Sequence, residues 1–158
     1  MAEKLNLLPS NHYCGRPGRS TTDAIHSIIK RTKDAWRKGL VASLLLLDVK
    51  GAFPSTAVDR LIHNMRMKGV PKEHIDWILR RLEGRRTKLI FNDYSSDSFV
   101  IDNGLDQGDP HSLICYLFYN TGLAEILIER NGESGVLFVD DNSILAVGKD
   151  FRTTHAMI

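Results

Sequence analysis

Two adjacent carboxylates, Asp140 and Asp141, stand between the apolar runs 134–137 and 142–147, which favour the two strands of a hairpin. Like charges side by side repel each other, and solvent, a proton or a cation relieves that repulsion. Mg²⁺ takes oxygen ligands from one or two carboxylates and leaves the rest of its shell to water and substrate phosphates. The pair therefore suggests a cation site. The alternative is a solvated turn, because Asp and Asn are ordinary turn residues.

A third carboxylate, Asp48, follows the apolar run 41–47, which predicts a buried strand. A carboxylate at the end of a buried strand is costly unless it is paired or bound to a cation. The alternative is that Asp48 caps the following turn. If the three aspartates form one site, Asp48 and Asp140 must lie on neighbouring strands of one sheet, although they are 92 residues apart.

The first element that could position these residues is a helix. Ser20 is a good N-cap, Asp23 completes a capping-box pattern, and Gly39 follows the expected end at Lys38. The face expected to pack carries Ile25, Ile28, Ile29 and Trp36 at helical spacing.

The remaining elements follow from capping residues, apolar runs and glycines. Helices are predicted from Ser55 or Thr56 to about Lys68, from Pro71 to about Glu83, and from Pro110 to about Arg130; strands are predicted at 88–91 and 98–101. The order of helices and strands predicts an α+β fold, a mainly antiparallel sheet with helices packed on one face.

Composition bounds the class of protein. The chain of 158 residues is 42% apolar and 25% charged, which excludes a disordered chain. It has no apolar run long enough to span a membrane and no secretory signal pattern. Cys14 and Cys115 lack metal-ligand spacing, so we expect free thiols in a reducing compartment.

Charge is distributed unevenly along the chain. Residues 1–92 carry 18 Lys and Arg against 8 Asp and Glu, whereas residues 93–158 carry 3 against 11. This asymmetry suits a site that grips a polyanion on one side and holds cations on the other. The alternative is two solvated faces that attract each other.

Five blocks in this order resemble the palm of reverse transcriptases, specifically those of non-LTR (LINE-type) retrotransposons. They are residues 16–25, 47–53, 82–87, 104–112 and 138–141. The resemblance implies a reverse-transcriptase-like palm fold. It also implies that Asp48 and Asp140, with the main chain of Val49, hold two Mg²⁺ ions, Mn²⁺ being the alternative metal, and that Asp141 is a weaker ligand.

The resemblance assigns further roles around an incoming nucleotide. Phe53 would be a steric gate against a ribose 2′-OH, Gly51 and Ala52 with Val49 would approach the triphosphate, and Gln107 would line the nucleotide. Phosphate contacts to template and primer would come from Arg16, Arg19, Arg85 and Arg86.

By this resemblance the chain is a single incomplete reverse transcriptase domain, with a finger-proximal segment at 1–40 and a palm at 41–158. The implied function is RNA-directed DNA polymerase, acting on an RNA template, a DNA primer and deoxynucleoside triphosphates in an intracellular, nuclear setting. We expect the isolated fragment not to polymerise at a useful rate. The alternative is a non-catalytic nucleic-acid-binding or interaction remnant of a mobile element. An RNA-dependent RNA polymerase is disfavoured by Phe53, because such an enzyme must admit the 2′-OH.

Overall fold

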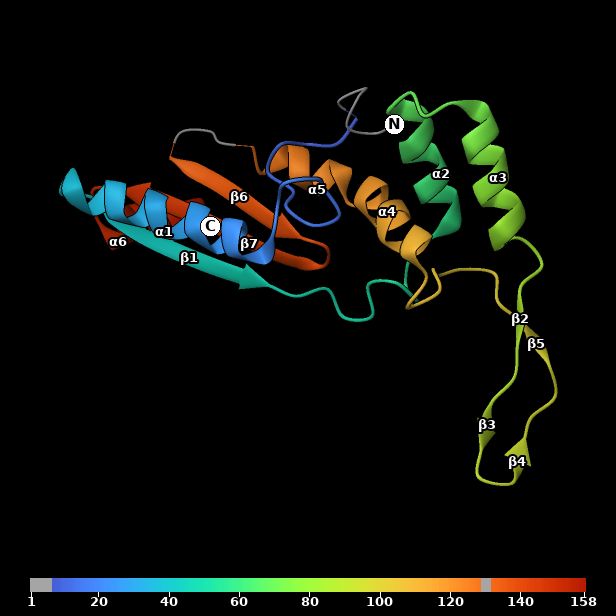
Figure 1. Ribbon diagram of the computed structural model, residues 1–158. Helices are drawn as coiled ribbons and strands as arrows, with labels where there is room; N and C mark the ends of the chain where they lie inside the picture. The colour runs from blue at the N-terminus through green and yellow to red at the C-terminus, as the bar shows by residue number, and fades with distance from the viewer. Residues whose placement is uncertain (1–6, 129–131) are drawn as a thin grey trace. The chain divides into compact units, whose positions relative to one another are not determined.

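The computed structural model describes residues 7–128 and 132–158 (Figure 1). The chain divides into two compact units, the first made of residues 1–50 and 120–158 and the second of residues 51–119. Within the described residues, no helix combines the length and apolar character needed to cross a membrane.

A three-stranded antiparallel sheet forms the centre of the first unit. β7 (Asp141–Gly148) lies between β1 (Val41–Leu47) and β6 (Glu133–Phe138). The register pairs Leu47 with Asn142 on one side of β7, and pairs Phe138 with Asp141 on the other. The predicted antiparallel α+β arrangement is confirmed, and the predicted hairpin 134–147 is β6 and β7.

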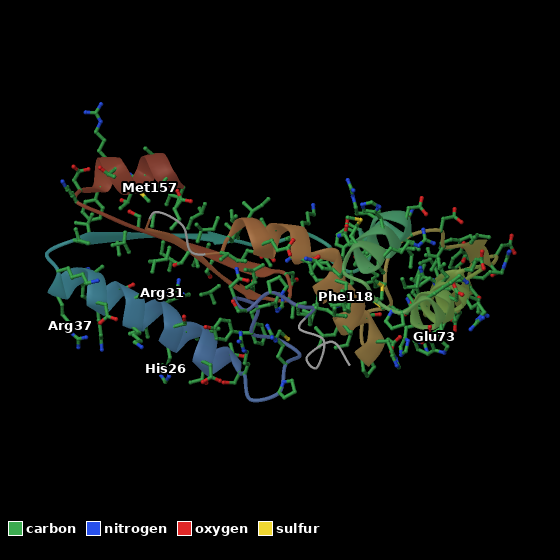
Figure 2. All side chains as sticks on the ribbon, turned by 90° about the horizontal axis from the view of Figure 1, so that it is seen from above. His26, Arg31, Arg37, Glu73, Phe118 and Met157 are labelled. Atoms are coloured by element: carbon green, nitrogen blue, oxygen red, sulfur yellow. The ribbon has the colours of Figure 1, made fainter. Side chains whose placement is uncertain are left out.

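Helices cover both faces of this sheet, whereas the sequence predicted one face. Figure 2 shows α1 (Thr21–Arg37) on one side of the strands and α6 (Phe151–Met157) on the other. The Ser43 hydroxyl of β1 bonds the Thr154 hydroxyl of α6 at 2.6 Å. α1 instead lies against the opposite face, where Leu46 and Val136 line a cavity that it covers. α6 was not predicted, although Asp150 is a clear N-cap that accepts the Thr153 N–H.

The ends of α1 are where the sequence placed them. The Ser20 and Asp23 capping box is formed, and Gly39 follows the helix with φ +69°. The predicted packing face is right only at Ile28, which is half-buried beside the sheet; Ile25 and Trp36 are 52% and 65% exposed and Ile29 is also exposed. The small residues Ala24 and Ala35 are buried instead. Both stripes have helical spacing, so periodicity alone could not decide which one meets the sheet.

The strand predicted to be buried, β1, is the outermost strand of the described sheet. Leu44, Leu46 and Leu47 are 45%, 67% and 42% exposed. Asp48, directly after the strand, is also exposed. The argument that Asp48 is costly because it ends a buried strand is therefore wrong. An apolar run cannot distinguish a central strand from an edge strand, since that difference depends on which strands lie beside it.

The second unit is built from helices and one hairpin. Its helices are α2 (Val58–Met67), α3 (Lys72–Leu82) and α4 (Pro110–Tyr119), and its strands pair as β2 (Arg86–Thr87) with β5 (Phe99–Val100) and β3 (Ile90–Phe91) with β4 (Tyr94–Ser95). The helix core buries Leu61, Met65, Ile75 and Leu117. The predicted strands 88–91 and 98–101 thus correspond to a hairpin with two short paired segments, β2 with β5 and β3 with β4. The turn between β3 and β4 contains Asn92 at φ 49°.

The start of α2 differs from the prediction. Thr56 does not cap it, because the buried Thr56 hydroxyl donates back to the Ala52 carbonyl at 2.9 Å. Ala57 is the N-cap, and the Asn103 side chain accepts the Val58 N–H at 3.3 Å. A residue 45 positions away therefore takes the capping role that a local hydroxyl was expected to play.

The long helix predicted from Pro110 is interrupted. α4 ends at Tyr119, and α5 (Thr121–Ile126) begins after Asn120. The predicted end at Arg130 lies outside the described residues. The break frees the Asn120 side chain for contacts in the first unit.

Candidate functional site

The three aspartates of the predicted cation site stand in the chain at one end of the first unit's sheet. The β1–β7 ladder ends with Leu47 opposite Asn142, so Asp48 directly follows β1 at the end of the sheet where Asp141 begins β7. Asp140 precedes Asp141 in the hairpin turn. β1 and β7 are neighbouring strands, as predicted, whereas the approach of the Asp48 and Asp140 carboxylates to each other stays a prediction.

The turn that carries Asp140 is strained. Phe138 pairs with Asp141, so Val139 and Asp140 alone connect the strands. Val139 has φ +60°. Two-residue hairpin turns need a positive φ, and Gly or Asn normally supplies it. A β-branched residue in that region is an outlier that costs on the order of 1–3 kcal/mol and persists only when the surroundings enforce it.

Two buried side-chain amides, which the sequence did not predict, donate hydrogen bonds to the backbone of the turn. The Asn120 amide donates to the Val139 carbonyl at 3.3 Å, and the Asn142 amide donates to the Asp140 carbonyl at 2.8 Å. Nothing local in the sequence singles out Asn120, but an Asn directly after two aspartates in an otherwise apolar strand could have been noticed.

A segment near the N-terminus lies along the outer edge of β6, beside the turn. His12 forms a parallel bridge with Leu137, and the Tyr13 N–H donates to the Leu137 carbonyl at 2.9 Å. His12 is 1% exposed. Burial, helped by the Arg16 guanidinium, lowers the pKa of His12 to about 4. Sequence reasoning missed His12 as well.

Cys14 lies close to the same turn. Burial raises the pKa of the Cys14 thiol, and the Asp140 carboxylate raises it further. Thiolate is a soft ligand, whereas Mg²⁺ and Mn²⁺ prefer oxygen ligands.

The donor set suits a hard divalent cation. Carboxylate oxygens are the ligands that Mg²⁺ and Mn²⁺ prefer. Mg²⁺ in nucleotide sites takes one or two carboxylates and completes its shell with water and phosphates. Asp48, Asp140 and Asp141 supply donors of that type at adjacent strand ends. Across the described residues, no three His, Cys, Asp or Glu side chains are grouped as a ready-made metal cluster.

The predicted nucleotide residues Phe53 and Gln107 belong to adjoining loops of the second unit. The Phe53 carbonyl accepts the Leu105 N–H at 2.8 Å, and the Gly104 N–H donates to the Thr56 carbonyl at 2.8 Å. The Phe53 ring stacks on Tyr116 with centroids 5.3 Å apart.

The two loops touch closely. A Cβ at Gly104 would lie 2.6 Å from the Pro54 carbonyl oxygen, so only glycine fits there. Gly51, expected near a triphosphate, has φ +62°, while Ala52 is buried. Gln107 is exposed, as is Val49 in the first unit.

The predicted phosphate contacts have partners within the protein. Arg85 binds Asp106 at 2.9 Å and the Gly104 carbonyl at 2.6 Å, and so braces the loop that carries Gln107. Arg86 donates to the Ser98 carbonyl at 2.8 Å.

The arginines of the N-terminal segment are also bonded internally. Arg16 donates to the Pro9 carbonyl at 2.5 Å, and Arg19 donates to the His12 carbonyl at 3.1 Å. Their role toward phosphates, like that of Arg85 and Arg86, stays a prediction.

Comparison with known proteins gives one family. The family described as "Reverse transcriptase (RNA-dependent DNA polymerase)" matches residues 1–156. This match extends over both units and includes Asp48, Asp140 and Asp141.

Two curated proteins are similar over part of the chain. A retrovirus-related Pol polyprotein from type-2 retrotransposable element R2DM of Drosophila melanogaster is 32% identical over 89 residues, 56% of this chain and 8% of that protein. A retrovirus-related Pol polyprotein from type-1 retrotransposable element R2 of Popillia japonica is 26% identical over 96 residues, 61% of this chain and 15% of that protein. The matched region is a small part of each relative.

Proposed function

The chain belongs to the reverse transcriptase (RNA-dependent DNA polymerase) family, and on that premise we propose that it carries the catalytic palm of an RNA-directed DNA polymerase. One observation supports this most strongly. The register of β1, β7 and β6 brings Asp48, Asp140 and Asp141 to one end of a single sheet, although Asp48 comes from a distant part of the chain.

We assign metal binding to these carboxylates. Asp48 and Asp140 would hold two Mg²⁺ ions, with Mn²⁺ as a substitute, assisted by Asp141 and the main chain of Val49. When bound, such ions lower the pKa of an attacking hydroxyl and stabilise the leaving oxygens in phosphoryl transfer. Hydrogen bonds from the Asn120 and Asn142 amides hold the backbone of the turn that carries Asp140, which fits a reaction that depends almost entirely on positioning and electrostatics.

In this proposal the second unit selects the nucleotide. Phe53, braced by Tyr116, would form a wall against a ribose 2′-OH, and Gln107 on the adjoining loop would contact the nucleotide. The backbone at Gly51 and Ala52 would approach the triphosphate. The partners are then an RNA template, a DNA primer and deoxynucleoside triphosphates.

We also propose that the isolated 158-residue chain extends primers slowly. A misplacement of about 1 Å can cost on the order of 100-fold in rate, and the chain alone matches 8% and 15% of its curated relatives. A non-catalytic interaction module remains the alternative function. It would bind template and primer without extending them.

The test is extension of a labelled DNA primer on an RNA template with Mg²⁺, using the chain, Asp140→Asn and Asp150→Asn. Asp150 caps α6, and Asn is an equally good N-cap, so Asp150→Asn is a matched control that should keep wild-type activity. We expect slow extension that Asp140→Asn reduces at least 100-fold. Equal extension by Asp140→Asn and wild type would refute the palm assignment.

A further inference from the structure

We propose that Asn120 and Asn142 are positioning residues for the Asp140 carboxylate, so that the metal affinity of the site depends on this buried amide pair. The inference rests on the proposed function, because it assumes that Asp140 binds a divalent cation. Neither amide belongs to the aspartate set, and neither is expected to touch the metal.

The turn needs such support. Val139 holds φ +60°, a conformation that L-residues other than Gly, Asn and Asp rarely adopt. Without contacts that favour it, the turn would relax to another backbone conformation. Asp140 is the next residue, so any such relaxation would move its carboxylate.

The amide pair binds both carbonyls of the turn. Asn120 donates to the Val139 carbonyl at 3.3 Å and Asn142 donates to the Asp140 carbonyl at 2.8 Å. Asn120 also donates to the Asn142 side-chain oxygen at 3.4 Å, which links the two amides. The two amides thus form a chain of hydrogen bonds that ends on the backbone of Asp140.

Because the two amides are buried, losing one of these hydrogen bonds would cost free energy. Asn142 is 1% exposed and Asn120 is 9% exposed. If one amide were removed, a turn carbonyl would lose its donor and the remaining amide would lose the buried hydrogen bond that links the pair; an unsatisfied buried polar group costs about 1–3 kcal/mol. The turn could recover that cost by moving, which would displace Asp140.

Asn142 also ties the turn to the strand that ends at Asp48. Its backbone is paired with Leu47 of β1 on one side and with Leu137 of β6 on the other. Successive side chains of a strand point to opposite faces, so the Asn142 side chain lies on the face opposite Asp141. Asn142 therefore connects the turn to both neighbouring strands through its backbone. Its side chain stays off the face of the sheet on which Asp141 lies.

The test measures Mn²⁺ binding by electron paramagnetic resonance of the free ion, using the full chain. The variants are Asn142→Leu, Asn120→Ala and their combination. Asp140→Asn shows whether binding occurs at the proposed site. Ser43→Ala is the matched control, because it removes another buried side-chain hydrogen bond of the first unit, to Thr154 at 2.6 Å, at a position of β1 four residues from Leu47. Circular dichroism verifies that each variant is folded.

We expect Asn142→Leu to weaken Mn²⁺ binding about 10-fold, since loss of a residue that orients a metal ligand typically costs 10–100-fold in affinity. Asn120→Ala should weaken it several-fold, and the double variant should be little worse than Asn142→Leu because the amides act as one unit. Ser43→Ala should lower the melting temperature and leave Mn²⁺ affinity unchanged.

Two other outcomes are distinguishable. If Asp140→Asn abolishes binding but the folded Asn variants bind as tightly as wild type, the amides stabilise the fold alone and the inference is wrong. If wild type shows no Mn²⁺ binding that depends on Asp140, the proposed function fails and the inference fails with it. Should Asn142→Leu not fold, Asn120→Ala, which leaves β7 untouched, decides the question.

Discussion

The buried imidazole of His12 should make the stability of the first unit depend on pH between about 4 and 6.5. His12 is 1% exposed, and neither ring nitrogen has a hydrogen-bond partner among the described residues. The nearby guanidinium groups of Arg16 and Arg19 further disfavour a second positive charge, and backbone groups of Cys14 and Val139 oppose this only in part. The ring is therefore held neutral in the folded protein.

The size of the effect follows from the two pKa values. Folding lowers the pKa of His12 from 6.5 to about 4. Between these values the unfolded chain binds more protons than the folded chain, so stability is complete above pH 6.5 and falls as the pH falls. The loss attributable to His12 should be about 2 kcal/mol at pH 5 and about 3 kcal/mol once the pH is below 4.

The assay is urea unfolding at pH 7.5, 6.0 and 5.0 for wild type and His12→Leu, which removes the titrating group and leaves no unpaired nitrogen. The free energy of unfolding of wild type should drop by about 2 kcal/mol more than that of the variant between pH 7.5 and 5.0. His26→Leu, at an exposed position on α1, is the control and should behave like wild type.

Two results would refute this reasoning. One is an equal pH dependence of unfolding for wild type and His12→Leu. The other is an NMR titration that places the pKa of His12 in the folded chain near its ordinary 6.5.

Three further predictions test other contacts. Gly104→Ala should destabilise the chain by about 2 kcal/mol or more, because its Cβ would meet the Pro54 carbonyl at 2.6 Å; Gly108→Ala, at a φ of +93° with open space around it, should cost less in the same urea unfolding experiment. Ser43→Ala removes a buried hydroxyl bond to α6 and should cost about 1 kcal/mol; an unchanged urea midpoint would contradict this. Phe53→Ala should raise the kcat/KM for ribonucleotides relative to deoxyribonucleotides in an active polymerase; an unchanged ratio would mean that the ring serves packing alone.

Local chemistry made several elements predictable from the sequence. The capping box of Ser20 and Asp23 and the turn at Gly39 fix α1 through bonds between residues three or four positions apart. The apolar runs on either side of Asp140 likewise predicted the hairpin of β6 and β7. The choice of Asp48 and Asp140 as partners came from the resemblance to reverse transcriptases, and the strand register then placed them at one end of the sheet.

Tertiary structure alone decided what depends on distant residues. Which stripe of α1 is buried, and that β1 lies at the edge of the sheet, follow from neighbouring elements that periodicity does not specify. The same holds for the Asn103 side chain that accepts the Val58 N–H and for His12 beside β6. Asn120 reaches the turn of Asp140 across 19 residues of chain because a helix breaks there. Side-chain burial and hydrogen-bond partners are set by contacts that form only when the chain is folded. Residue type and spacing could therefore predict the three aspartates, but not the two amides that bond the turn of Asp140.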